Sequence, residues 1–229
     1  MTLLKKVFCS FAILFFSQSA LAAEYSVEIT NLTHKISFTP RIVISHIPVS
    51  FFSAGDDLND SEGGLLNGQV NNALREIAES GNIVPMQLIL DQASIAPLVA
   101  HATGDGLLNS GQKQTVILND NEGLSKISLF AMMLPTNDGF IALNNKDLPQ
   151  TGSINYFLNA YDAGTETNTE SCIDIPGPLC EGAGLSPDDA GEGFVHIHRG
   201  IRGLGSDIDP AIYDWNNPVA IVTITKIND

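Results

Sequence analysis

The chain has 229 residues, and its 26 Asp and Glu residues against 11 Lys and Arg residues give a formal net charge of −15. Nucleic acids and anionic membrane surfaces attract clusters of Lys and Arg, so this charge argues against both as partners. It fits a soluble exported protein, or a protein that neutralises part of its acidic charge with bound cations.

Residues 1–22 have the pattern of a secretory signal peptide. Lys5 and Lys6 precede a short apolar run, and Ala20-Leu21-Ala22 matches a signal-peptidase cleavage site. The apolar run is too short to span a bilayer, and no later segment is long and apolar enough to do so. We therefore expect a periplasmic or secreted protein whose residues 23–229 form one domain. Cleavage removes two lysines and no acid, which changes the formal charge to −17.

The rest of the chain is dominated by short strand-like runs with Gly, Asn and Asp between them. The expected strands are 25–32, 36–38, 42–47, 116–118, 127–134, 140–143, 154–160, 194–197 and 219–227. Several short strands separated by turn residues are typical of an all-β sandwich or barrel. We predict an antiparallel β-sandwich of about eight strands with one or two short covering helices.

One amphipathic helix is predicted over residues 67–80. Val70, Leu74, Ile77 and Ala78 share one face, and Gly81 is suited to end the helix. The pattern places Arg75, Glu76 and Glu79 on the opposite, solvent-facing side. A weaker apolar stretch over 93–100 is a short helix or a strand, and Pro97 limits either.

The segment 165–206 is rich in Gly, Pro and acidic residues and is predicted to be a long loop. It contains the only two cysteines that follow the signal peptide, Cys172 and Cys180. In an oxidising compartment we expect them to form a disulfide. The alternative is a metal site, but no histidine lies near these two thiols.

Two turns deliver carboxylates after apolar runs. The segment 134–140 supplies Asp138, and the segment 160–166 supplies Asp162 and Glu166. Calcium ions bind carboxylate and carbonyl oxygens, so these acids would form a Ca²⁺ site if the two turns meet at one end of the sandwich. The alternative is that Asp138 and Asp162 are turn residues that accept local N–H bonds.

The two turns also resemble the signature of the spondin N-terminal domain. The resemblance extends in order over 25–33, 44–46, 74–81, 134–140, 161–166 and 217–227, and its most specific parts are Pro-x-x-Asp and Asp-Ala-Gly-Thr-acid. It implies a C2-like antiparallel β-sandwich with a calcium ion at one pole, bound by Asp138, Asp162 and Glu166. Glu166 replaces the Asp of the animal members, and Gly139 stands at the position of their Trp.

A second candidate metal site is the pair His196-x-His198. Two histidines with this spacing on a strand point to one face and would bind Zn²⁺ or Cu²⁺ together with His46 or Glu192. The alternative is a solvent-facing pair near a strand end.

The function that we expect from the sequence is recognition rather than catalysis, because no nucleophile elbow or phosphate-binding loop occurs. We predict an exported, calcium-binding β-sandwich that acts as a binding or adhesion module for an extracellular protein or glycan. The alternatives are a transition-metal-binding protein or metalloenzyme that uses His196 and His198, and a structural domain without a metal.

Overall fold

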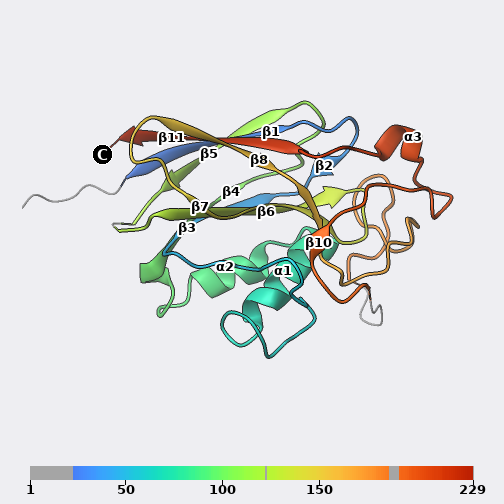
Figure 1. The fold of residues 1–229 in the computed structure, drawn as a ribbon, viewed down its shortest axis with the longest axis horizontal. Helices are drawn as coiled ribbons and strands as arrows, with labels where there is room; N and C mark the ends of the chain where they lie inside the picture. The colour runs from blue at the N-terminus through green and yellow to red at the C-terminus, as the bar shows by residue number, and fades with distance from the viewer. Residues whose placement is uncertain (1–22, 122, 186–190, 229) are drawn as a thin grey trace, which may run out of the picture.

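The computed structural model describes residues 23–121, 123–185 and 191–228. Two antiparallel β-sheets lie face to face, and helices cover the outer face of the larger sheet (Figure 1). The expected signal peptide, residues 1–22, lies outside the described residues. None of the described helices has the length and apolarity that crossing a membrane requires.

The smaller sheet has the strand order β5-β1-β11-β8. Its strands are β1 (Glu24–Asn31), β5 (Lys113–Asn119), β8 (Ser153–Leu158) and β11 (Ala220–Asn228). The larger sheet has the order β10-β9-β7-β6-β3-β4, with β2 paired to β6. Its strands are β2 (Ser37–Phe38), β3 (Arg41–His46), β4 (Val99–Gly104), β6 (Lys126–Leu134), β7 (Gly139–Asp147), β9 (Ala160–Asp162) and β10 (His196–Ile197). The predicted antiparallel β-sandwich with few short helices is therefore confirmed.

The main core lies between the two sheets. Along β1 the side chains alternate, so that Tyr25, Val27 and Ile29 are buried while the residues between them are partly exposed. The neighbouring strand β11 contributes Val222 and Ile224 to the same core. This alternation is the pattern of a sheet with one face in the core and one face toward solvent.

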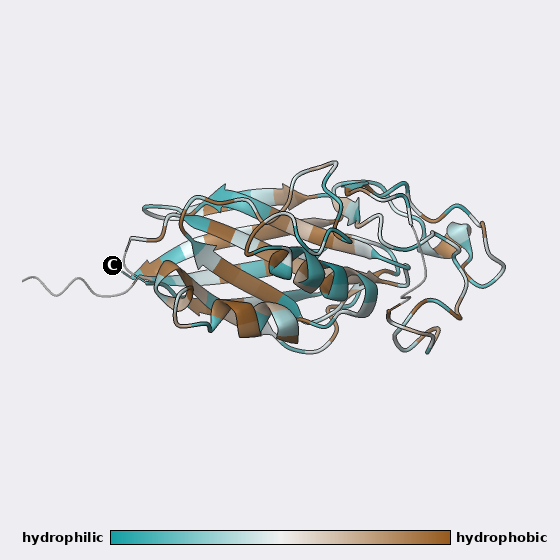
Figure 2. Ribbon diagram, turned by 90° about the horizontal axis from the view of Figure 1, so that it is seen from below, coloured by the Kyte–Doolittle hydropathy of each residue, from teal (hydrophilic) through white to brown (hydrophobic). Residues whose placement is uncertain are grey.

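A second core lies between the larger sheet and two helices, α1 (Gln69–Ser80) and α2 (Val84–Leu90). Figure 2 shows both helices lying across this sheet. Since the sheet is covered on both faces, β6 is buried at every position after its first residue. The molecule thus has three layers, with the larger sheet in the middle.

The helix predicted over 67–80 is confirmed as α1, which ends at Gly81 with a backbone φ of 69°. One part of the prediction was wrong, because Glu79 is fully buried. Its carboxylate lies 2.7 Å from the Arg75 guanidinium, one turn earlier on the helix. The pairing offsets the cost of burying this charge, and the amphipathic pattern of the sequence does not reveal it.

The segment 93–100 contains a short 3₁₀ helix, η1 (Ala96–Leu98), and the first two residues of β4, which continues to Gly104 beyond the stretch that the sequence indicated. The strand predicted over 154–160 is divided between the two sheets. Its first part, β8, pairs with β11, and its second part, β9, pairs with β7 and β10. The chain crosses between the sheets at Asn159, and this crossing brings Asp162 to the edge of the larger sheet.

The long segment after β9 is irregular as predicted, with β10 and the short helix α3 (Pro210–Tyr213) as its regular elements. Cys172 and Cys180 form a disulfide within it, as the sequence predicted. The segment gathers at the end of the sandwich where β7 begins and β9 ends (Figure 1).

Candidate metal centre

Asp138 is the first of the predicted ligands, and it lies in the turn between β6 and β7. Thr136 shapes this turn, because its hydroxyl donates to the Met133 carbonyl at 2.6 Å and accepts from the Gly139 N–H at 3.0 Å. The Asp138 side chain is fully buried. A short polar turn therefore holds a carboxylate inside the protein.

The Asp138 carboxylate connects the two predicted turns. Its Oδ2 accepts hydrogen bonds from the backbone N–H groups of Thr165 and Glu166 at 2.8 and 3.1 Å, and from the Thr165 hydroxyl at 3.3 Å. Its Oδ1 is buried and has no hydrogen-bond partner among the described residues. One oxygen of Asp138 thus fixes the loop, and the other accepts no hydrogen bond from the described residues.

Asp162 is the last residue of β9 and lies between β7 and β10. It is paired with Gly139 on one side and with His196 on the other. Its Oδ1 accepts from the Gly164 N–H at 2.9 Å, and its Oδ2 accepts from the Asn168 amide at 2.8 Å. Asp162 therefore faces the Asp138 turn and the histidine pair at once.

Glu166 completes the predicted group, and its side chain is fully buried. Burial is the main cause that raises the pKa of Asp138 well above its usual range, and the charges of Asp162 and Glu166 raise it further. The N–H groups of Glu166 and Thr165 act in the opposite direction. The two predicted turns therefore do meet, and they bring three buried carboxyl groups together.

The ion pairs that Asp162 forms among the described residues are with histidines. None of the described ion pairs joins a Lys or Arg to Asp138 or Asp162. Buried carboxylates without cationic partners are costly unless they are protonated or bind a metal ion. This arrangement differs from that of acids that only cap turns.

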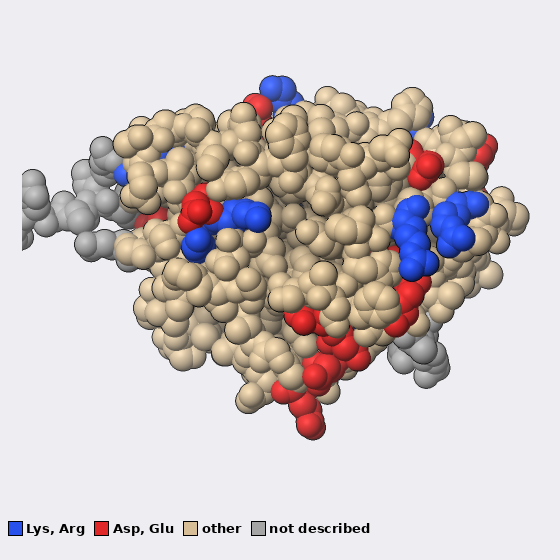
Figure 3. Space-filling model, in the orientation of Figure 1, with Lys and Arg blue, Asp and Glu red and all other residues tan. Residues whose placement is uncertain are grey.

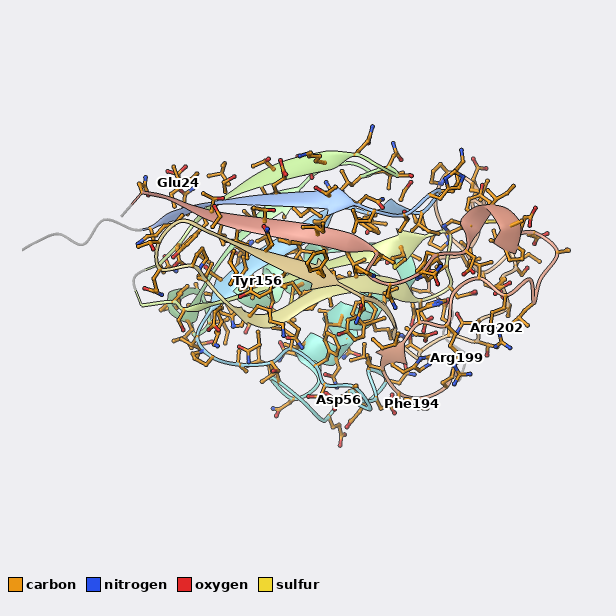
Figure 4. The ribbon with its side chains drawn as sticks, turned by 45° about the horizontal axis from the view of Figure 1, so that its top comes forward. Glu24, Asp56, Tyr156, Phe194, Arg199 and Arg202 are labelled. Atoms are coloured by element: carbon orange, nitrogen blue, oxygen red, sulfur yellow. A yellow bond between two sulfur atoms is a disulfide. The ribbon has the colours of Figure 1, made fainter. Side chains whose placement is uncertain are left out.

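A comparison within the molecule shows that difference. Figure 3 shows acidic side chains gathered along the lower edge of the molecule, and Figure 4 places Asp56 there. Asp56, Asp57 and Asp60 line a surface cavity, and each accepts a backbone N–H bond from its own turn. These three residues are exposed turn acids, whereas Asp138, Asp162 and Glu166 are buried.

Gly164 holds the Asp162 turn against the segment that leads into β10. Its φ is +67°, and a Cβ at this position would lie 2.3 Å from the Phe194 carbonyl oxygen. Its own carbonyl accepts the Gly193 N–H at 2.8 Å. The Asp-Ala-Gly-Thr-Glu sequence therefore needs glycine at its centre both for the left-handed conformation and for the close approach of a second backbone.

The two histidines of the second predicted site both lie against Asp162. His196 Nε2 is 3.7 Å from Asp162 Oδ1, and His198 Nε2 is 3.9 Å from Asp162 Oδ2. They line a cavity of about 140 Å³ together with Glu192, whereas His46 hydrogen-bonds to Ser128 within the sheet. Of the two partners considered from the sequence, the structure brings Glu192 to the histidines and leaves His46 away from them.

Asp162, Glu192 and His196 form one further group of interest. Each offers a ligand atom, and these atoms all lie within 4.8 Å of one another. Asp138 and Glu166 are not members of this group. The sequence separated the acidic turn from the histidine pair, and no local signal indicated that Asp162 belongs to both.

His198 has a different environment from His196. Its ring contacts Trp215 with a centroid distance of 4.9 Å, and its Nδ1 accepts the Gly200 N–H at 3.0 Å. Burial lowers the pKa of the His198 imidazole, and the Asp162 carboxylate opposes that effect. His198 is therefore a buried neighbour of the site. It is not part of a solvent-facing pair near a strand end, which was the alternative considered from the sequence.

No protein-family model matches the chain, and no curated protein matches it. The resemblance to spondin N-terminal domains stays a prediction from the motifs.

Proposed function

We propose that this protein is an exported, calcium-binding β-sandwich that acts as a recognition or adhesion module in the periplasm or outside the cell. Asp138, Asp162 and Glu166 are the proposed calcium ligands. The observation that carries the proposal is the buried carboxylate of Asp138, whose Oδ1 has no hydrogen-bond partner among the described residues and whose Oδ2 ties the two turns together.

Calcium suits this site better than a softer ion, because its preferred ligands are carboxylate and carbonyl oxygens. Binding would offset the mutual repulsion of the three acids, which adds to the effect of burial in raising the pKa of Asp138. It would also hold the start of β7 and the end of β9 in one arrangement. In this proposal calcium stiffens the loop-bearing end of the sandwich.

A rigid loop platform on a sandwich is a common way to present a recognition surface. The irregular segment after β9 lies at the same end of the sandwich as the proposed ligands and carries a disulfide. We propose that this end of the molecule binds an extracellular protein or a glycan. A calcium-dependent surface of this kind requires no catalytic residue.

The first prediction tests whether the folded protein binds Ca²⁺. Thermal unfolding of residues 23–229 should shift upward when millimolar Ca²⁺ replaces excess chelator, because an ion that binds only the folded state stabilises it. At a hundredfold excess over Kd the gain is about 2.7 kcal/mol. Asp138→Asn should lose most of the shift, whereas Asp60→Asn, which changes an exposed turn acid, should keep it. Identical melting curves with Ca²⁺ and with chelator would contradict calcium binding.

Binding of an extracellular protein or glycan is tested by a separate measurement. Wild-type protein and Asp138→Asn can be immobilised and probed with a glycan array and with extracellular proteins, each with Ca²⁺ and with chelator. We expect a ligand that binds the wild type only with Ca²⁺ and does not bind the variant. A ligand that binds both proteins equally would argue against a calcium-dependent surface.

A further inference from the structure

The His196 imidazole has the hydrogen-bond pattern of a metal ligand. Its Nδ1 lies 2.9 Å from the Ile197 carbonyl oxygen. A carbonyl can only accept, so Nδ1 carries the proton and, in the neutral ring, Nε2 presents a lone pair. Metal-binding histidines commonly donate their second ring N–H to a backbone carbonyl in this way, which fixes the tautomer of the ring.

The lone pair of His196 Nε2 faces a second hydrogen-bond acceptor, the Asp162 carboxylate. The atom is buried, has no hydrogen-bond partner among the described residues, and lies 3.7 Å from Asp162 Oδ1. Two acceptors at this distance repel each other unless a proton or a metal ion lies between them. Ligands about 2.0–2.2 Å from a tetrahedral metal ion are roughly 3.4 Å apart, so the observed spacing needs only a small closing movement.

Glu192 supplies a third ligand atom, within 4.8 Å of those of Asp162 and His196. The Asn168 amide connects the two acids, because it donates to Asp162 Oδ2 at 2.8 Å and to Glu192 Oε1 at 3.2 Å. It therefore holds both carboxylates on the side of the cavity that His196 faces.

His198 is a second buried polar group aimed at the same place. Its Nδ1 accepts from Gly200, so the neutral ring carries its proton on Nε2. That Nε2 has no hydrogen-bond partner among the described residues and lies 3.9 Å from Asp162 Oδ2. His198 thus offers an N–H to Asp162 rather than a lone pair to an ion, and only one of the two histidines is placed to be a ligand.

We propose that Asp162, Glu192 and His196 form a site for a divalent transition metal of the Zn²⁺ class. One imidazole and two carboxylates suit such an ion and differ from the all-oxygen set that calcium prefers. Glu192 is exposed and the cavity of about 140 Å³ opens beside it, so an ion can enter from solvent. Three protein ligands leave a fourth position for water or for a group of a bound partner.

Arg199 and Arg202 also line this cavity, at the loop-bearing end of the molecule (Figure 4). Both are exposed. The proposed metal site and the proposed calcium site share Asp162, but the metal site does not rest on calcium binding. Its ligands Glu192 and His196 have no part in the calcium proposal.

The test uses residues 23–229 produced without a histidine tag and freed of metal with a chelator. Co²⁺ serves as a spectroscopic probe, because its visible absorption strengthens when it leaves water for a four-coordinate site. Zn²⁺ affinity is then measured by competition with a chromophoric chelator. We expect one Co²⁺ equivalent with strengthened absorption, which one equivalent of Zn²⁺ displaces.

His196→Ala should weaken Zn²⁺ binding by roughly a hundredfold or more, since removal of even a residue outside the ligand sphere costs about 10–100-fold. His34→Ala, which changes an exposed histidine away from the cavity, should bind Zn²⁺ like the wild type. Asp138→Asn should keep Zn²⁺ affinity while it loses the calcium response. Unfolding in chelator verifies that each variant is folded.

Three results would overturn the proposal: no strengthened Co²⁺ absorption, equal Zn²⁺ affinity of the wild type and His196→Ala, or joint loss of Zn²⁺ and Ca²⁺ binding in folded His196→Ala. The last would mean a single shared site. Zn²⁺ binding that depends on His196 in a protein without any calcium response would support this proposal and refute the proposed function.

Discussion

Asp162 is the residue on which both proposed metal sites depend. Its two oxygens already accept hydrogen bonds from Gly164 and Asn168. These bonds leave further lone-pair directions, because a carboxylate has about four of them. A substitution at Asp162 would therefore affect both sites, whereas Glu166 and His196 separate them.

At the residue scale, Glu166 gives the sharpest test of the calcium ligands. Glu166→Gln removes one charge from a buried group of acids and should weaken Ca²⁺ binding by roughly tenfold or more, since affinity depends on ligand charge. Glu166→Asp keeps the charge on a shorter side chain and should retain a site with altered affinity. Isothermal titration of both variants measures the difference. Wild-type affinity in Glu166→Gln would mean that Glu166 is not a ligand.

At the scale of elements, the site depends on how the turn after β9 is held against the segment before β10. Gly164 is the contact point, because its backbone lies against Phe194 and its carbonyl accepts from Gly193. The contact keeps Asp162 and His196 in register although the two residues are far apart in the sequence.

Gly164→Ala should therefore destabilise the protein by about 3 kcal/mol or more. Roughly 1 kcal/mol comes from the left-handed conformation and the rest from displacement of the Phe194 backbone. Gly106→Ala is the matched control, because Gly106 has a similar φ of +65° with open space around it, and it should cost only about 1 kcal/mol. Urea unfolding in chelator measures both values. Equal losses in the two variants would show that the close approach is unimportant.

At the scale of the whole molecule, the larger sheet is the central layer and carries a core on each face. The strands that position the site, β7 and β9, belong to this layer. Both cores therefore contribute to the rigidity of the proposed metal sites, since a site on a well-packed sheet is held in place by its neighbours.

Leu74 on α1 is a direct probe of the helix-side core, because its side chain is 1% exposed. Leu74→Ala should cost about 2–5 kcal/mol, the range for deleting a buried leucine side chain. Leu88→Ala on α2 is the control, since Leu88 is 65% exposed and its loss should change stability by about 0.5 kcal/mol or less. Chemical unfolding of both variants tests whether α1 is an integral layer.

The sequence by itself determined the class of the fold and most of its strands. The alternation along β1, whose period is set by backbone geometry, and the mostly apolar run of β6 are local patterns, so they are readable without a partner strand. The same holds for α1, whose apolar face repeats at helical spacing. The local sequence also indicated Asp138, Asp162 and Glu166 as carboxylates delivered by turns.

Only the tertiary structure decided which elements those strands and helices pack against. The burial of Glu79, the extension of β4 beyond residue 100 and the division of 154–160 between two sheets all depend on how the elements pack. The junction of the acidic turn with His196 is the clearest case. It arises because β9 pairs with β7 on one side and β10 on the other, and such long-range pairing is set by the packing of the whole sandwich rather than by any local signal.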